Sequence, residues 1–222
     1  MRRLPIFLLS LFFLFFLSGC WFGPGLADWT FLVYMAADNN LDPYAGLDLQ
    51  EMMAVGSTPG MRVIVQYDPA SSGHPTKRYR VTKGNLVALA SLGETNTGDP
   101  TVLEDFLTWG MRNFPARRYA LVLWNHGSGI YDNFSSTGKA ASKGLLSPSP
   151  AVAVDDTSGK DALTTREYAL ALERAAQAGK PLELVCFDAC YMAMAEVAAE
   201  LAPFTRYLVA SEEAVPGNGL DY

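Results

Sequence analysis

Histidine and cysteine are scarce in this chain, whose 222 residues include 2 histidines and 3 cysteines. Basic residues are also few, with 17 Lys and Arg against 23 Asp and Glu, and they form few clusters. A nucleic-acid-binding protein needs a basic footprint for the phosphates, so a nucleic-acid partner is not expected. The formal net charge of −6 better suits a substrate or partner that carries positive charge.

Several short motifs are absent as well. There is no Gly-rich phosphate-binding loop of either standard spacing and no repeat with a period of about 20–50 residues. No second cluster of Cys or His accompanies Cys186 and Cys190, so the sequence predicts no metal site there. An extended chain between these two cysteines spans roughly 13 Å, and a disulfide needs Cα atoms within about 7 Å. Unless the segment folds back sharply, both thiols are expected to stay free.

The N-terminal segment is expected to lie outside the folded domain. Arg2 and Arg3 precede an apolar run over residues 6–17, and small residues follow, which is the pattern of an export signal over residues 1–19. The run is too short for a membrane-spanning helix. The length of the remaining chain suits one domain, and half of all residues are hydrophobic, which is enough for a substantial core.

Residues 17–20, Leu-Ser-Gly-Cys, resemble the bacterial lipobox, in which the cysteine is lipidated and becomes the first mature residue. The alternative is an ordinary signal peptide with an incidental Cys20. With a lipobox, residues 20–28 form a tether and residues 29–222 form the domain. The sequence then predicts a protein of the bacterial cell envelope, lipid-anchored to the membrane through Cys20 and facing the extracytoplasmic side.

Strand-like and helix-like patterns alternate along the domain. Apolar, β-rich runs predict strands, and apolar residues at helical spacing predict helices between them. This order predicts an α/β fold with a mostly parallel central sheet flanked by helices. Residues 129–161 are rich in Gly, Ser and Asp and are expected to form a long loop. The expected strands are 29–35, 61–67, 78–82, 86–89, 119–124, 182–187 and 207–210, and the expected helices are 41–53, 99–113, 164–178 and 191–201.

Two of the expected strands end at reactive side chains. The run over residues 119–124 is followed by Asn125, His126 and Gly127, and the run over 182–187 is followed by Asp188 and Cys190. Open α/β sheets bind ligands just outside the carboxyl ends of their strands. His126 and Cys190 are therefore expected at one sheet edge, the arrangement that a Cys/His nucleophilic hydrolase needs.

Each of these residues also has a structural interpretation. Cys190 is predicted just before a helix, whose N-terminus would favour the thiolate, with Asp188 as the N-cap; the alternative is a small buried hydrophobe. His126 is either catalytic or a structural histidine at the strand end, and His74 is expected to be a solvated loop residue. Gly127 allows a substrate close to the backbone, and its N–H and that of Cys190 are placed to form an oxyanion hole.

Taken together, these segments resemble the clostripain family of cysteine peptidases, within the caspase-like group that includes gingipains and legumains. The resemblance covers roughly residues 29–222, in the order that the family shows. The matching segments are Tyr34-Met-Ala-Ala-Asp-Asn-Asn-Leu41, Leu123-Trp-Asn-His-Gly-Ser-Gly129, Phe187-Asp-Ala-Cys-Tyr-Met192, Ala210-Ser-Glu-Glu213 and Pro216-Gly217.

The resemblance implies a caspase-like α/β sandwich and an exported cysteine endopeptidase that cleaves proteins or peptides after Arg or Lys. It implies Cys190 as nucleophile, His126 as general base and acid, and the Gly127 N–H as an oxyanion donor. It also implies that Asp188 lies in the S1 pocket, where a carboxylate pairs with the cation of a basic P1 residue. For Asp188 the alternative is helix capping alone.

The family usually continues beyond the equivalent of Tyr222 with further sheet and helices, so the domain is expected to be incomplete at its C-terminus. Family members are often cut between the histidine and cysteine strands. In this chain that segment carries Lys139 and Lys143, and we expect self-cleavage after one of them.

No cofactor is expected. Calcium is the weaker alternative, since clostripain itself is associated with calcium. However, Asp155, Asp156 and Asp161 lack the spacing of an EF-hand and are expected to be solvated loop acids. The rival to the peptidase is a non-catalytic, lipid-anchored binding protein on a caspase-like scaffold.

Overall fold

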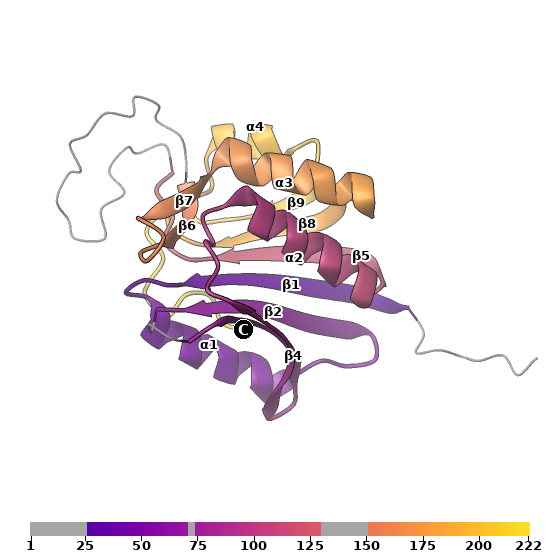
Figure 1. The fold of residues 1–222 in the computed structure, drawn as a ribbon. Coiled ribbons are helices and arrows are strands. Elements are labelled where there is room, and N and C mark those ends of the chain that lie inside the picture. Colours follow the sequence, from indigo (N-terminus) through magenta and orange to yellow (C-terminus); the bar gives the residue numbers. More distant parts are fainter. Residues whose placement is uncertain (1–25, 71–73, 130–150) are drawn as a thin grey trace, which may run out of the picture.

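The computed structural model describes residues 26–70, 74–129 and 151–222 (Figure 1). The expected export signal, the lipidation site at Cys20 and the expected cleavage sites after Lys139 and Lys143 lie outside the described residues. Among the described residues, no helix combines the length and the apolar composition that a membrane span requires.

A seven-stranded sheet forms the centre of the molecule, with the strand order β4-β3-β2-β1-β5-β8-β9. The strands β2, β1, β5, β8 and β9 run parallel to one another in this order across the sheet. At the other edge, β3 and β4 form a hairpin that is antiparallel to β2 and within itself. The predicted mostly parallel sheet is therefore confirmed. The strands are β1 (Ala27–Ala37), β2 (Met61–Pro69), β3 (Thr76–Thr82), β4 (Asn85–Gly93), β5 (Ala116–Trp124), β8 (Leu182–Asp188) and β9 (Thr205–Val209).

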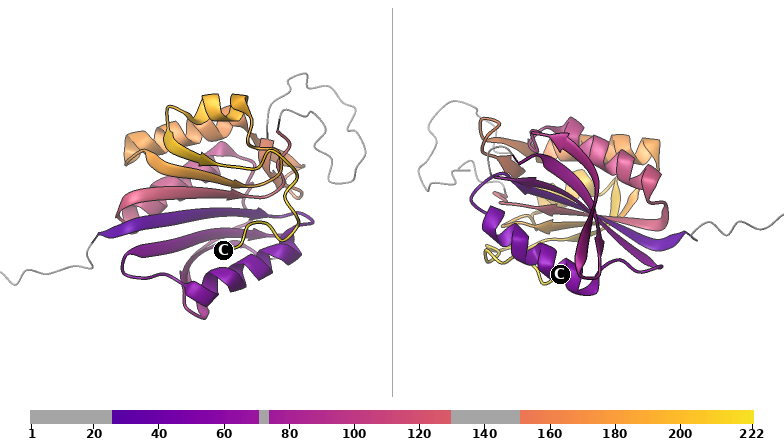
Figure 2. Two further views of the ribbon diagram at one scale, coloured as in Figure 1. Left: turned by 180° about the vertical axis from the view of Figure 1, so that it is seen from behind. Right: turned by 60° about the horizontal axis from the view of Figure 1, so that its bottom comes forward.

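Helices cover both faces of the sheet, with α1 on one side and α2, α3 and α4 on the other (Figures 1 and 2). Alternate residues of a strand point to opposite faces, and β1 shows this clearly: Leu32 and Tyr34 pack on the side of α2 and α3, whereas Val33 and Met35 pack toward α1. Both faces are buried, which explains the continuous apolar run. The helices are α1 (Asp42–Val55), α2 (Pro100–Asn113), α3 (Thr165–Ala178) and α4 (Ala195–Leu201).

Local signals set the starts of two helices. Asp99 is the N-cap of α2, accepting the Thr101 N–H at 2.8 Å, and Pro100 follows in the first turn. A capping box joins Thr164 and Glu167 at the start of α3, as the sequence predicts.

The segment expected to be a loop over residues 129–161 contains an element that the prediction missed. Residues 151–164 form a small antiparallel hairpin of β6 (Ala151–Asp155) and β7 (Asp161–Thr164). An isolated bridge from Gly127 to Val152 joins this hairpin to the end of β5. Such strands of four or five residues give little periodicity in a sequence rich in Gly and Asp.

Helix α1 is tied to β5 by a buried carboxylate. Asp48 is 1% exposed, and its Oδ2 accepts the Trp124 indole N–H at 2.6 Å, while Oδ1 has no partner among the described residues. Burial raises the pKa of Asp48 from 3.8 to about 6; the Trp124 hydrogen bond opposes this shift, and the charges of Asp188 and Glu51 add to it. The folded protein therefore holds the proton of this carboxyl group more tightly than the unfolded chain.

We expect Asp48→Asn to increase the free energy of unfolding by about 1–2 kcal/mol at about pH 8, because it removes a buried charge and keeps an acceptor for Trp124. The raised pKa gives stability that is present at low pH and is lost as pH rises through about 6. The difference between the variant and the natural protein should thus shrink at about pH 4.5. Urea unfolding at both pH values measures it, and a variant that is less stable at about pH 8 would contradict this account.

Candidate active site

The two strands that end at reactive side chains are neighbours in the sheet. β5 and β8 pair in parallel with Trp124 opposite Asp188, and the Asn125 N–H donates to the Asp188 carbonyl at 3.2 Å. The residues that follow each strand therefore leave the sheet at the same edge. The segments after β5 and β8 therefore lie side by side, as the sequence predicts.

A cavity of about 260 Å³ opens at this edge. His126, Asp188 and Cys190 all line it, so the structure brings together the three side chains singled out from the sequence. The remaining lining comes mainly from the strand ends and from residues 215–219: Leu41, Trp124, Asn125, Ala189, Val215, Pro216, Gly217 and Gly219.

Cys190 lies in a turn directly after β8, and the prediction of a helix starting at Tyr191 is wrong, because α4 begins only at Ala195. Tyr191 has a φ of 60°, and the N–H groups of Tyr191 and Ala193 donate to the carbonyls of Glu213 and Ser211 at 3.1 and 3.0 Å. These bonds to the segment after β9 compete with helix formation. Within the part of the chain that the structure describes, no helix N-terminus therefore lies at the thiol.

The two described cysteines have different surroundings, and both are free thiols. Cys186 is 8% exposed, and burial raises its pKa to about 11. Cys190 is half-buried, and the Val215 N–H donates to its Sγ at 3.3 Å. Cys190 is thus the accessible thiol of the pair, and the interpretation as a fully buried hydrophobe does not fit it.

His126 is held by a residue that the sequence analysis did not select. Its Nε2 lies 2.8 Å from Oδ1 of Asn40, in the turn after β1. Since an amide oxygen only accepts, His126 donates in this contact in the tautomer that carries its hydrogen on Nε2. Burial lowers the pKa of His126, and the charge of Asp156 opposes that shift.

The backbone before His126 is fixed by the side chain of Asn125. Its amide nitrogen donates to the carbonyls of Ala36 on β1 and Val154 on β6. Asn39 donates to the same two carbonyls, at 3.1 and 2.9 Å. In the sequence, Asn39, Asn40 and Asn125 are indicated only by their presence in the segments that resemble the family. An Asp-Asn-Asn run by itself also indicates no more than the end of a strand.

Gly127 lies against the backbone of the nucleophile candidate. A Cβ at this position would come within 2.3 Å of the Cys190 carbonyl oxygen and 3.0 Å of the Cys190 nitrogen. Only glycine allows this approach. The backbones of Gly127 and Cys190 are therefore close neighbours.

Asp188 is the last residue of β8 and is 4% exposed. Its carboxylate accepts the Leu220 N–H at 3.2 Å and the Tyr222 hydroxyl at 2.9 Å. Burial raises its pKa, and these two hydrogen bonds partly offset the shift. The prediction of Asp188 as a helix N-cap is wrong, because the N-cap of α4 is Met194, which makes no side-chain cap bond.

Other acidic and basic candidates lie elsewhere. His74 is exposed, as expected, and Glu212 and Glu213 are exposed and do not line the cavity.

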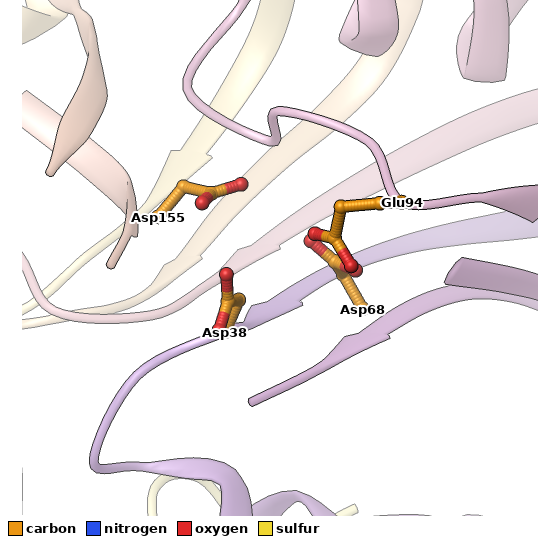
Figure 3. A group of neighbouring side chains, drawn as sticks. All are labelled: Asp38, Asp68, Glu94 and Asp155. Atoms are coloured by element: carbon orange, nitrogen blue, oxygen red, sulfur yellow. The ribbon is translucent and has the colours of Figure 1, made fainter. Parts of the chain in front are cut away.

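The expectation of a solvated Asp155 is wrong, because this residue ends β6 and is 0% exposed. Asp156 is half-buried and Asp161 is exposed. Asp155 instead gathers with Asp38, Asp68 and Glu94 in an acidic cluster next to the site (Figure 3).

Comparison with known proteins gives a consistent result. The model of the clostripain family matches residues 33–222. Clostripain of Hathewaya histolytica is 28% identical over 222 residues, covering 87% of this chain and 40% of that protein.

Two solved structures share the fold. A secreted C11 cysteine protease of Bacteroides thetaiotaomicron, in complex with an irreversible peptide inhibitor, has a TM-score of 0.68 and 24% identity over 88% of this chain and 52% of that chain. An inactive zymogen C11 protease of Parabacteroides distasonis has a TM-score of 0.67 and 23% identity over 90% and 53% of the two chains. The chain thus spans about half the length of these relatives or less.

Proposed function

Because the chain belongs to the clostripain family of cysteine peptidases, we propose that it works as an exported cysteine endopeptidase that cleaves after Arg or Lys. The observation that carries the proposal is the shared cavity, which presents a half-buried thiol, an imidazole and a buried carboxylate at one sheet edge. These are a nucleophile, a base and an anionic recognition group.

The proposed reaction uses Cys190 and His126 as a dyad. His126 takes the thiol proton, and Cys190 Sγ attacks the carbonyl carbon of the scissile bond. The Gly127 and Cys190 N–H groups stabilise the oxyanion that forms. His126 then gives its proton to the leaving amine, which leaves an acyl-enzyme. A water molecule, deprotonated by His126, hydrolyses the thioester and releases the new carboxyl terminus.

Asp188 is the proposed recognition group for the basic P1 side chain. It lines the cavity two residues before Cys190, and its carboxylate is almost fully buried. Its hydrogen-bond partners, the Leu220 N–H and the Tyr222 hydroxyl, are neutral donors. An Arg or Lys side chain would therefore supply the positive charge that this carboxylate lacks, and guanidinium can bind in a bidentate manner.

The cell-envelope location also belongs to this proposal. We infer that residues 1–19 direct export and that Cys20 carries the lipid anchor, with residues 20–28 as the tether. The B. thetaiotaomicron relative is described as secreted, which agrees with an extracytoplasmic location. The proposed maturation cuts follow Lys139 or Lys143.

The recognition role of Asp188 is tested by replacing it with Asn and measuring hydrolysis of matched peptides with Arg, Lys or Asp at P1. We expect the variant to lose at least about tenfold in kcat/KM for Arg at P1, because the substrate cation is left without its partner. Alkylation of Cys190 by a small reagent should not change, since nucleophile and base are intact. If Asp at P1 is cleaved best, or if the rate for Arg at P1 is unchanged, the S1 carboxylate lies elsewhere.

The role of His126 as base predicts the pH dependence. Since burial lowers its pKa below the ordinary 6.5, the acidic limb of kcat/KM should fall below that pH, where His126 becomes protonated. The Asp156 charge favours the protonated form, so Asp156→Asn should move this limb to still lower pH. Asp161→Asn, on an exposed residue of the same hairpin, is the matched control and should leave the limb in place. A limb that moves to higher pH in Asp156→Asn would contradict the assignment.

A further inference from the structure

The edge of the central sheet opposite the candidate active site carries a group of arginines. The parallel strands β1, β2 and β5 begin at this edge, and the antiparallel β3 ends beside the start of β2 (Figure 1). Helix α2 also ends here, shortly before β5 begins. These elements contribute Arg62, Arg80, Arg112, Arg117 and Arg118, which together form the basic edge. Because the arginines belong to four separate elements, only the fold brings them to one side of the molecule.

Three members of the basic edge share one cavity. Arg62, Arg80 and Arg112 line a cavity of about 810 Å³, and none of the described residues that line it with them is acidic. Arg80 and Arg112 are exposed and form no ion pair with a carboxylate of the described ranges. Guanidinium groups bind phosphate oxygens through paired N–H donors. The cavity therefore has the charge and the donors that a phosphate site needs.

The other two arginines extend the positive charge along the edge. Arg117 lies 3.4 Å from the Asp28 carboxylate, with the two side chains 67% and 61% exposed, and such exposed pairs are weak. The guanidinium carbon of Arg118 lies 4.8 Å from the centroid of the Trp29 ring. Tryptophan and basic side chains both suit the headgroup layer at the boundary between water and lipid. The basic edge therefore presents cations and an aromatic ring together.

The charge of the molecule is divided between its two edges. The opposite edge carries the acidic cluster and Asp188, and the formal net charge of the chain is −6. A negative surface repels a chain of this net charge unless the chain turns a positive side toward it. Because the two signs lie at opposite ends of the strands, an anionic surface attracts the basic edge and orients the molecule.

We propose that the basic edge binds the phosphate groups of anionic membrane lipids, with the cavity of Arg62, Arg80 and Arg112 as the headgroup site. This docking rests on the proposed cell-envelope location. β1 begins on this edge at Ala27, and residues 20–26 lead to it from the proposed lipid anchor at Cys20. A chain of this length spans at most about 25 Å, so the anchor keeps the basic edge close to the membrane. A lipid chain and a basic patch together give stable attachment.

Docking by the basic edge would place the candidate active site on the side of the domain away from the membrane. β5 joins the two edges, and its 9 residues at about 3.3 Å each put His126 roughly 30 Å from the lipid surface. The proposed peptidase would then cleave soluble or protruding chains rather than segments at the bilayer surface. This consequence depends on the peptidase function, whereas the binding of anionic lipid does not.

The test uses the full chain bound to vesicles of phosphatidylcholine, alone or mixed with phosphatidylglycerol, and treated with the arginine reagent phenylglyoxal. Mass spectrometry gives the modification rate of each arginine. We expect Arg80, Arg112 and Arg118 to react at least about fivefold more slowly on the anionic vesicles, because lipid phosphates cover them. This protection should disappear at about 1 M salt, which screens the attraction. Arg166, exposed at the start of α3, is the internal control and should react equally on both vesicles.

Two matched double variants assign the protection to the basic edge. Arg80→Gln combined with Arg112→Gln changes two exposed residues and should remove most of the protection of Arg118 on anionic vesicles. Lys160→Gln combined with Arg166→Gln removes the same charge from two exposed residues outside the basic edge and should leave that protection unchanged. Neither measurement uses peptidase activity, and sedimentation with neutral vesicles reports the anchor alone, so the failure of each proposal is distinguishable.

Three outcomes overturn the proposal. Equal modification rates on neutral and anionic vesicles would reduce the basic edge to structural support for the end of α2, where Arg62 Nη1 donates to the Pro115 carbonyl at 2.8 Å. Full protection of Arg118 in the Arg80→Gln, Arg112→Gln variant would place the lipid contact elsewhere. Equal protection by millimolar inorganic phosphate on neutral vesicles would assign the cavity to a soluble phosphate compound instead of a lipid.

Discussion

The parallel pairing of β5 with β8 sets the relative position of His126, Asp188 and Cys190 at the candidate active site. With Trp124 opposite Asp188, the segments that follow the two strands must leave the sheet side by side. Gly127 then lies so close to the Cys190 backbone that no side chain fits between them. A shift of this register by one residue would turn the side chains of one strand to the opposite face and would separate His126 from Cys190.

The second recurring feature is buried negative charge near the carboxyl ends of the strands. Asp48, Asp188 and three members of the acidic cluster are each at most 4% exposed, and burial raises the pKa of Asp48, Asp188, Asp68 and Asp38. A protein gains little stability from carboxylates in such places. For Asp188 the better explanation is a positively charged partner, and we propose a basic P1 side chain.

The sequence predicted the sheet and the meeting of His126 and Cys190 at its edge because both depend on strong local patterns. Apolar runs gave the strands, the Thr164 capping box gave the start of α3, and the residues after two strands gave His126 and Cys190. It failed where tertiary contacts override local preference, as at Tyr191, whose hydrogen bond to the segment after β9 prevents an earlier start of α4. The acidic cluster escaped prediction because its members are far apart in the chain, and only the sheet topology brings the strand ends together.

The most direct test of the account is covalent labelling by an irreversible peptidyl probe with Arg at P1, mapped by mass spectrometry. The account predicts labelling of Cys190 but not of the buried Cys186, and a fall in labelling rate of at least about a hundredfold in His126→Ala. A small alkylating reagent should still reach Cys190 in that variant, which shows that the thiol remains accessible. Absence of labelling, or equal labelling with and without His126, would contradict the peptidase and favour a binding protein on this scaffold.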